Sequence, residues 1–252
     1  MDNFILDIQN VTYIKNNIKL INDISFSLKE GENLIIFGPE DSGMTRLSEL
    51  IIQANPDYEG NIIYKGKSIK TLDHFEQLMH KRDIGYVHRD YGLLSNMTVE
   101  QNISLPLEYH STLSASRIQE HVESMIWILN LEHCKKLRPI DLTGAEILKT
   151  AFARAMVRDP DLLYIEHVFK IHCPLNIIKL IHFLVDRSKR GDKSLIALTY
   201  YPQDFINIAD SFIMLFKGAI VFNGDREDFM NSDNPYLVQY KTNSIKGPME
   251  IL

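Results

Sequence analysis

The chain has 252 residues, of which 45% are hydrophobic, enough to form the core of a large folded domain. Its 27 basic and 33 acidic residues give a formal net charge of −6, which argues against a broad basic surface that binds nucleic acid. No run of about 18 apolar residues is present, and the first residues lack the pattern of a secretory signal, so no membrane span is expected. The two cysteines, Cys134 and Cys173, lack CxxC spacing and predict a reducing compartment without a cysteine metal site.

The first third of the chain is predicted to consist mainly of strands. Residues 33–37 (NLIIF) form a short apolar run, as expected of a strand that is buried on both faces. A glycine loop follows it directly, and residues 45–53 then repeat their apolar side chains at helical spacing. Strands are predicted over residues 4–13, 18–28 (one or two strands), 33–37, 61–64 and 84–87.

The rest of the chain alternates between helical segments and short apolar strands. Residues 99–156 have a mostly helical pattern, and residues 116–129 carry one apolar helix face. Buried strands are predicted at residues 162–165, 194–198 and 212–216. This alternation predicts an α/β fold with a mainly parallel sheet, and the polar residues 226–252 are interpreted as a C-terminal extension.

The glycine loop fits the phosphate-binding pattern G-x-x-x-x-G-K-[ST] at every fixed position except one. In that pattern the backbone N–H groups hold the phosphates, the lysine contacts the β- and γ-phosphates, and the hydroxyl meets Mg²⁺. Met44 takes the place of the lysine, so the loop has lost its strongest cation. The loop consists of Gly38, Pro39, Glu40, Asp41, Ser42, Gly43, Met44 and Thr45.

Four motifs in a fixed order carry a family resemblance. They are the glycine loop, the ARAM segment at 153–156, the RDPDLL segment at 158–163 and the Ala209-Asp210 pair. Over nearly its whole length the chain resembles the nucleotide-binding subunit of ABC transporters. The resemblance implies a RecA-like P-loop core with an antiparallel β-subdomain and a helical subdomain at about residues 91–157. The domain would span residues 1–229, with an extension at 230–252, and would work as a dimer under a membrane permease.

Several further segments resemble one branch of this family, the subunits that serve MCE-protein lipid transporters of the Mla type. They are the NMTV segment at 96–99, the NISLPL segment at 102–107 and the tail motifs at 224–226, 233–240 and 247–248. The branch implies phospholipid transport and a peripheral position on the cytoplasmic face of the membrane. In this family a groove beside the helical subdomain receives a permease helix. Here Tyr91, Leu93, Leu94 and Met97 either line that groove or cap the subdomain core, and residues 235–248 would contact the second subunit.

The departures from the family pattern fall at its catalytic positions. Glu166 replaces the metal-binding aspartate and is one methylene longer, whereas magnesium tolerates displacement poorly. His167 replaces the glutamate that polarises water, although an imidazole can accept a proton near neutral pH. Arg89 replaces the family's glutamine that links the metal and the water to the permease-facing loop; it is either a solvated side chain or a substitute cation for phosphate. Tyr200 replaces the switch histidine, which would contact the γ-phosphate, and is interpreted as a packed aromatic.

The signature stretch and an upstream tyrosine complete the expected site. In the family's LSGGQ signature, Thr143 keeps the hydroxyl of the serine and Gly144 allows the backbone to approach phosphate closely. Glu146 instead adds a negative charge that would repel phosphate. Tyr13 is either the family's aromatic residue that stacks on adenine or an ordinary strand residue. Cys173 is expected to be a small buried side chain near the position of the family's D-loop aspartate. The expected nucleotide contacts are Tyr13, the loop residues 38–45, Arg46, Thr143 and Gly144, and the expected metal contacts are Thr45 and Glu166.

These observations together predict that ATP and Mg²⁺ bind weakly or not at all and that hydrolysis is slow or absent. Losing one charged hydrogen bond to phosphate costs on the order of 1.5–3 kcal/mol, which leaves room for residual binding. Each lost polar stabiliser costs about 10²–10³ in rate, and four are replaced here. Two alternatives remain open: a slow but active ATPase, possibly completed by an intact partner subunit, or a scaffold that uses the fold only for protein contacts.

Overall fold

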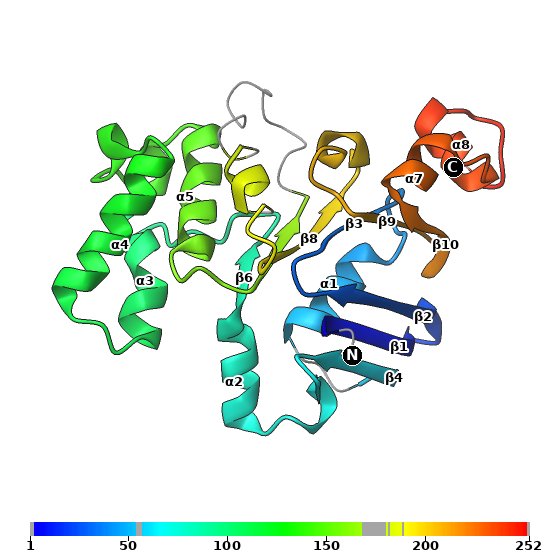
Figure 1. The fold of residues 1–252 in the computed structure, drawn as a ribbon, viewed down its shortest axis with the longest axis horizontal. Helices are drawn as coiled ribbons and strands as arrows, with labels where there is room; N and C mark the ends of the chain where they lie inside the picture. Colours follow the sequence, from blue (N-terminus) through cyan, green and yellow to red (C-terminus); the bar gives the residue numbers. More distant parts are fainter. Residues whose placement is uncertain (1–2, 54–56, 168–179, 181, 188, 251–252) are drawn as a thin grey trace.

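The computed structural model describes residues 3–53, 57–167, 180, 182–187 and 189–250 (Figure 1). Cys173, expected near the D-loop, lies outside these residues. The smaller of two sheets is antiparallel with the order β2-β1-β4-β5. Its first two strands form a hairpin around Asn16 and Asn17, which both have the positive φ that tight hairpin turns require. The strands are β1 (Phe4–Lys15), β2 (Ile18–Lys29), β4 (Glu59–Tyr64) and β5 (Lys67–Ser68).

The larger sheet has six strands in the order β10-β9-β3-β8-β7-β6. The five strands from β9 to β6 run parallel, and β10 pairs antiparallel with β9. Every residue of β3, β7 and β8 is buried, as their apolar sequences predict. The strands are β3 (Asn33–Phe37), β6 (Ile84–Val87), β7 (Leu162–Glu166), β8 (Ser194–Thr199), β9 (Ser211–Phe216) and β10 (Ala219–Asp225). The predicted α/β class is therefore confirmed.

Helices form a separate subdomain beside β6, drawn in green in Figure 1. It contains α3 (Val99–His110), α4 (Ala115–Ile128) and α5 (Gly144–Met156). Thr98 and Thr143 begin α3 and α5 with reciprocal caps, in which each threonine and the side chain three residues later satisfy backbone N–H groups. Two further helices, α1 (Met44–Gln53) and α2 (His74–Asp83), follow the glycine loop and the small sheet. The sequence prediction missed α2, β5 and β10.

The C-terminal segment forms two helices, α7 (Arg226–Asn231) and α8 (Pro235–Thr242). Leu237 is fully buried, and the Gln239 side chain exchanges hydrogen bonds of 2.8 and 2.7 Å with the backbone of Met249. The Tyr240 ring lies 5.4 Å from that of Phe37 at the end of β3. This segment, which reads as a polar extension in the sequence, therefore packs against the large sheet of its own chain.

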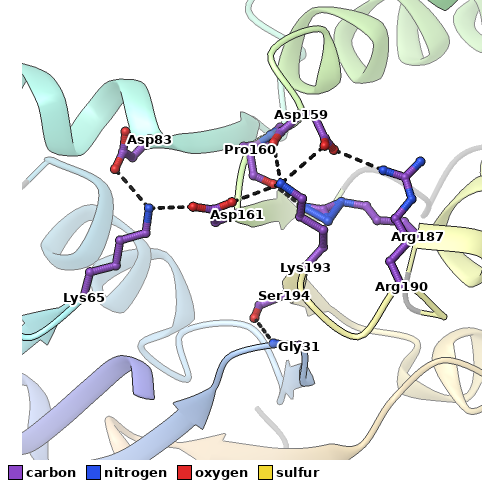
Figure 2. Close-up of polar contacts among 10 residues, drawn as sticks. All are labelled: Gly31, Lys65, Asp83, Asp159, Pro160, Asp161, Arg187, Arg190, Lys193 and Ser194. Atoms are coloured by element: carbon purple, nitrogen blue, oxygen red, sulfur yellow. Dashed lines mark hydrogen bonds and ion pairs between the residues drawn. The ribbon is translucent and has the colours of Figure 1, made fainter. Parts of the chain in front are cut away.

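A network of charged side chains joins distant segments at the amino ends of the parallel strands (Figure 2). Lys65 forms ion pairs with Asp83 at 3.1 Å and Asp161 at 2.8 Å. Lys193 forms ion pairs with Asp161 at 3.0 Å and Asp159 at 3.3 Å. Because Asp83, Asp161 and Lys193 directly precede β6, β7 and β8, the network fixes the small sheet to the start of the large one.

Among the described residues, no helix has the length and apolar character needed to cross a membrane.

Candidate functional site

The carboxyl ends of four neighbouring parallel strands bring the expected catalytic positions to one edge of the large sheet. The glycine loop follows β3, Arg89 lies two residues beyond β6, Glu166 ends β7 with His167 next to it, and Tyr200 follows β8. Open α/β sheets bind ligands at this edge. The fold therefore collects side chains from four separate stretches of sequence into one candidate site.

Contacts with neighbouring backbone fix the conformation of the glycine loop. A Cβ on Gly38 would lie 2.2 Å from the Leu215 carbonyl oxygen, so only glycine fits there. Gly43 has a φ of +102°, and the backbone of the buried Ser42 accepts a hydrogen bond of 2.9 Å from Gly218. Asp41 also has a positive φ, of 58°. The loop keeps the backbone form of a phosphate site through contacts with β9 and the turn that follows it.

Met44, the residue in the lysine position, points away from solvent. Its exposure is 3%, and it belongs to the apolar core between the small sheet and the large one. Arg46 pairs with Glu49 one turn later at 2.5 Å, and Thr45 is partly exposed. Pro39 lies at the start of the loop, and the carboxylates of Glu40 and Asp41 are exposed. The charges that the loop itself presents to solvent are therefore negative.

Glu166 is a buried carboxylate with one partnered oxygen. Its side chain is 2% exposed, and its Oε2 accepts a hydrogen bond of 2.6 Å from the hydroxyl of Tyr86 on β6. Burial and this hydrogen bond raise the pKa of Tyr86, so its hydroxyl remains a donor. The Oε1 atom is buried and has no hydrogen-bond partner among the described residues. His88 lies 3.9 Å from Oε2.

His167 and Tyr200 form a stacked pair. Their ring centroids are 4.3 Å apart with an angle of 24° between the planes, and the His167 backbone has a φ of 50°. The Tyr240 hydroxyl has one proton, which it shares between the carbonyl oxygens of Tyr200 at 2.8 Å and Gly38 at 3.2 Å. Burial, with the nearby carboxylate of Glu40, raises the pKa of Tyr200. Two aromatic rings thus occupy the positions expected of the base and the switch residue.

Arg89 and Tyr13 are two further predicted residues, from the loop after β6 and from β1. The Arg89 side chain is 52% exposed and is 3.9 Å from the Asp90 carboxylate. Tyr13 is half-buried on β1 and pairs with Ile21, whose side chain lies beside Gly43. Tyr13 is therefore one strand away from the glycine loop.

Thr143 and Gly144 lie at the start of α5, on the helical subdomain. The Thr143 hydroxyl donates a hydrogen bond of 2.8 Å to Glu146 Oε2, so it is engaged in the helix cap. Glu146 also bonds His133 at 2.6 Å through Oε1. The backbone N–H of Thr143, followed by His133, lowers the pKa of Glu146. The expected repulsive charge is therefore directed at the first turn of its own helix and at His133.

A groove of about 650 Å³ lies between α2, β6 and the helical subdomain. The four residues predicted to line this groove or to cap the subdomain core do not lie together. Leu94 and Met97 line the groove, whereas Tyr91 and Leu93 pack against the core of the helical subdomain, where Arg154 donates to the Tyr91 carbonyl at 2.8 Å. Its other apolar lining includes Leu78, Leu105, Pro106 and Tyr109.

Sequence reasoning missed Tyr86 and Tyr240, which contact Glu166, Tyr200 and the glycine loop. Tyr86 lies in the segment 84–94 that contributed to the family resemblance, but its pairing with Glu166 depends on the register of β6 against β7. Nothing in the sequence around Tyr240 indicates that it reaches residues 40 and 202 positions earlier.

Comparison with known proteins places the chain in a family. The family profile described as "ABC transporter" matches residues 21–166, more than half of the chain. The molybdate/tungstate import ATP-binding protein WtpC of Pyrococcus abyssi is 31% identical over 84% of this chain, which spans 60% of WtpC. The intermembrane phospholipid transport system ATP-binding protein MlaF is 21% identical in Haemophilus influenzae and 24% identical in Escherichia coli K12. These alignments cover 99% and 97% of this chain and 94% and 91% of MlaF.

Solved structures share the fold. The ATP-binding cassette MJ0796, in a dimeric post-hydrolysis state with ADP and Pi, matches with a TM-score of 0.81 at 21% identity. The match covers 88% of this chain and 98% of MJ0796. The cbiO1 protein of Clostridium perfringens, part of the cbiONQ transporter complex, matches with the same TM-score at 20% identity over 96% of this chain. The predicted P-loop fold is confirmed, and the chain belongs to the ABC transporter family.

Proposed function

We propose that this chain is a nucleotide-binding subunit of a phospholipid transporter of the MCE/Mla branch and that it hydrolyses little or no ATP. It would lie on the cytoplasmic face of the membrane, bound to a permease and paired with a second nucleotide-binding subunit. The stacked pair of His167 and Tyr200 is the observation that carries the proposal about hydrolysis. Position 167 offers no carboxylate to polarise a water, and its ring is held against a second ring.

Nucleotide binding is proposed to be weak. The glycine loop keeps the backbone form that suits a phosphate chain, because backbone N–H groups at a helix start favour anions. The side chains do not neutralise that charge, because Met44 is buried and Arg46 is paired with Glu49. Arg89 is the candidate substitute cation, since its side chain is 52% exposed and its ion pair with Asp90 is long, at 3.9 Å.

A magnesium ion would find few ligands here. Thr45 supplies a hydroxyl, and Glu166 Oε1 is a buried oxygen without a hydrogen-bond partner in the described part of the chain, which suits a cation. Glu166 Oε2, however, already accepts the Tyr86 hydroxyl. Since Mg²⁺ demands near-ideal octahedral geometry, this pair fits at most a loosely held ion. The residues present do not fit the hydrolysis of ATP, and no hydrolytic step is assigned to them.

Two observations support the phospholipid branch and a permease partner. The MlaF relatives align over nearly the whole chain and nearly their own whole length, whereas WtpC extends well beyond the matched part. The groove beside the helical subdomain is a mainly apolar hollow with Leu94 40% exposed at its edge, which suits an apolar helix from a partner.

Turnover tests the first part of the proposal. Purified protein is assayed for Mg-ATPase activity beside a Thr45→Ala variant, which defines the background. Equal rates are expected, since the cation, the base and the switch residue are all replaced. A clear rate that disappears in His167→Ala would instead favour a slow enzyme with an imidazole base.

Attachment to a permease tests the second part. Leu94→Asp places a charge in the groove while the Leu94 backbone keeps its bond of 2.8 Å to Asn102 Oδ1, so the variant is expected to fold and to leave the membrane fraction. Trp127→Asp is the matched control, because Trp127 on α4 is 71% exposed and does not line the groove, and this variant is expected to stay attached. If wild-type protein is found alone and away from membranes, the scaffold alternative replaces the transporter proposal.

Pairing with a second subunit is tested by a point substitution in the tail. Removing residues 235–252 would expose the core that Leu237 fills. Val238 is 42% exposed on α8, so Val238→Asp changes the outer face of the tail without entering the core. This variant is expected to weaken pairing of the two subunits in size-exclusion chromatography of the purified complex and to leave permease attachment intact.

A further inference from the structure

Three side chains of different chemistry converge beneath the start of α5, away from the glycine loop. His133 and Cys134 lie on a single turn, η2 (Glu132–Cys134), and Glu146 lies in the first turn of α5. One ligand atom from each of these side chains lies within 4.8 Å of the other two. Cys134 is buried, Glu146 is half-buried, and His133 is exposed, so the cluster opens to solvent on one side.

The two oxygens of Glu146 have separate tasks. Oε2 accepts hydrogen bonds from the backbone N–H of Thr143 at 2.7 Å and from its hydroxyl at 2.8 Å. Oε1 faces the cluster and lies 2.6 Å from His133 Nε2. A cation held between Oε1 and the imidazole would therefore leave the cap of α5 intact. On the third side, the Cys134 thiol donates a hydrogen bond of 3.4 Å to the Leu131 carbonyl oxygen.

We propose that His133, Cys134 and Glu146 bind one divalent transition-metal ion of the zinc class, with water completing the coordination. A nitrogen, sulfur and oxygen ligand set favours borderline-soft ions over Mg²⁺ or Ca²⁺. Bonds of about 2.0–2.3 Å place tetrahedral ligands about 3–4 Å apart, so the present spacing needs only small side-chain adjustments. Binding displaces the thiol proton of Cys134 to solvent, and the sulfur becomes a thiolate ligand.

Nucleophilic chemistry at the same residues is excluded by the surroundings of the thiol. Cys134 is 1% exposed, which leaves its thiol inaccessible to a bulky substrate. A reactive cysteine needs a lowered pKa and access to solvent. Cysteine spacing alone predicts no metal site, because the other two ligands are a histidine and a glutamate from different segments.

The bound ion would join η2 to the amino end of α5. The segment between these ligands carries Thr143 and Gly144, two of the expected nucleotide contacts. A metal would therefore stabilise this part of the helical subdomain by binding only the folded chain. The inference uses the geometry of η2 and α5 and does not depend on the proposed transport function.

Cobalt titration of the full-length protein tests the site. Co²⁺ is added to reduced wild-type protein and followed by the near-ultraviolet thiolate-to-cobalt absorption and by the visible bands of tetrahedral cobalt. We expect one Co²⁺ per chain, displaced by one Zn²⁺. The chain has two cysteines, so Cys173→Ser is the matched control and is expected to keep the thiolate absorption. Cys134→Ser is expected to abolish it.

The other two ligands are tested by variants that preserve the fold. His133→Gln changes an exposed side chain, and Glu146→Gln keeps an oxygen for the cap, so both are expected to fold normally. Each should weaken Zn²⁺ binding by more than about 100-fold, beyond the effect of losing a group outside the ligand shell. Absence of the thiolate absorption in the wild type, its loss in Cys173→Ser, or unchanged Zn²⁺ affinity in both glutamine variants would overturn the proposal.

Discussion

The two edges of the large sheet are made from the same strands and have opposite character. At the amino edge, Lys65, Lys193 and three aspartates are joined in ion pairs of 2.8–3.3 Å (Figure 2). At the carboxyl edge, Glu166 keeps a buried oxygen without a partner among the described residues, and His167 stacks on Tyr200. Ion pairs dominate the amino edge, whereas aromatic packing around a buried carboxylate dominates the carboxyl edge.

The contrast separates the fold from its chemistry. The amino-edge network joins residues 65, 83, 161 and 193, so it ties the small sheet to three strands of the large one. None of these residues belongs to the glycine loop or to the expected catalytic positions. Substitutions at the carboxyl edge can therefore remove catalytic groups while the ion pairs that hold the architecture remain. The ion-pair network therefore makes no use of Met44, Glu166, His167 or Tyr200.

The largest effect is expected from removing the centre of the amino-edge network. The Lys193 side chain is 11% exposed, and Lys193→Met would leave Asp159 and Asp161 without this partner. The free energy of unfolding should fall by about 2–3 kcal/mol, below the ~3–5 kcal/mol of fully buried pairs because both aspartates are half-exposed. Urea denaturation measures the change. Lys189→Met, at a 71% exposed lysine, is the control and should change it by less than about 0.5 kcal/mol.

At the carboxyl edge, the corresponding experiment restores a lost group. Met44→Lys should raise the affinity for Mg-ATP by at least about tenfold, since a charged hydrogen bond contributes about 1.5–3 kcal/mol. Calorimetry measures the affinity, and Met44→Leu, which keeps the apolar side chain, should leave it unchanged. Turnover should stay absent, because His167 and Tyr200 are still in place. Equal affinities for the lysine and leucine variants would mean that the loop does not bind phosphate.

Tyr240→Phe tests how the tail supports the carboxyl edge. The substitution removes the hydroxyl that bonds the carbonyls of Tyr200 and Gly38 and leaves the ring contact with Phe37. The free energy of unfolding should fall by about 1 kcal/mol, as expected for a buried hydroxyl. Tyr236→Phe on the same helix is the matched control. Identical denaturation curves for the two variants would show that the tail does not hold this edge through its hydroxyl.

The smallest effect concerns acid stability at the amino edge. Hydrogen bonds from Lys65, and further from Lys193, lower the pKa of Asp161 below its ordinary value of 3.8. The stabilisation is present above that value and is lost as the pH falls through the lower folded pKa. Asp161→Asn should therefore flatten the stability curve below about pH 4. Asp186→Asn, at a 76% exposed aspartate, should leave its slope unchanged; a common slope in both variants contradicts this assignment.

Sequence patterns predicted the parts of the fold that have a simple period or motif. The strands β3 and β7 are short, mostly apolar runs, and the glycine loop between β3 and α1 has fixed spacing. In contrast, β10 contains Asn223-Gly224, a pair that favours turns, and α8 begins at Pro235 in a polar stretch. Both elements are stabilised by tertiary contacts that a local pattern does not contain.

The candidate site divides in the same way. The replaced positions could be located from motif order, but not the conformations of the new side chains. The burial of Met44 depends on the core under the small sheet, and the Tyr86–Glu166 bond depends on strand register. The cluster of His133, Cys134 and Glu146 joins residues 12 and 13 positions apart, because η2 lies beside the start of α5.

The exposed carboxylates of the glycine loop have a consequence for the rate at which a nucleotide arrives. Glu40 and Asp41 precede a helix start that has no lysine, and the whole chain carries a net charge of −6. Phosphate sites usually attract their ligand, so added salt slows association. Here salt would screen repulsion, because the Debye length falls from about 30 Å at 0.01 M to about 8 Å at 0.15 M ionic strength. A triphosphate should therefore associate faster as ionic strength rises, the reverse of the usual trend.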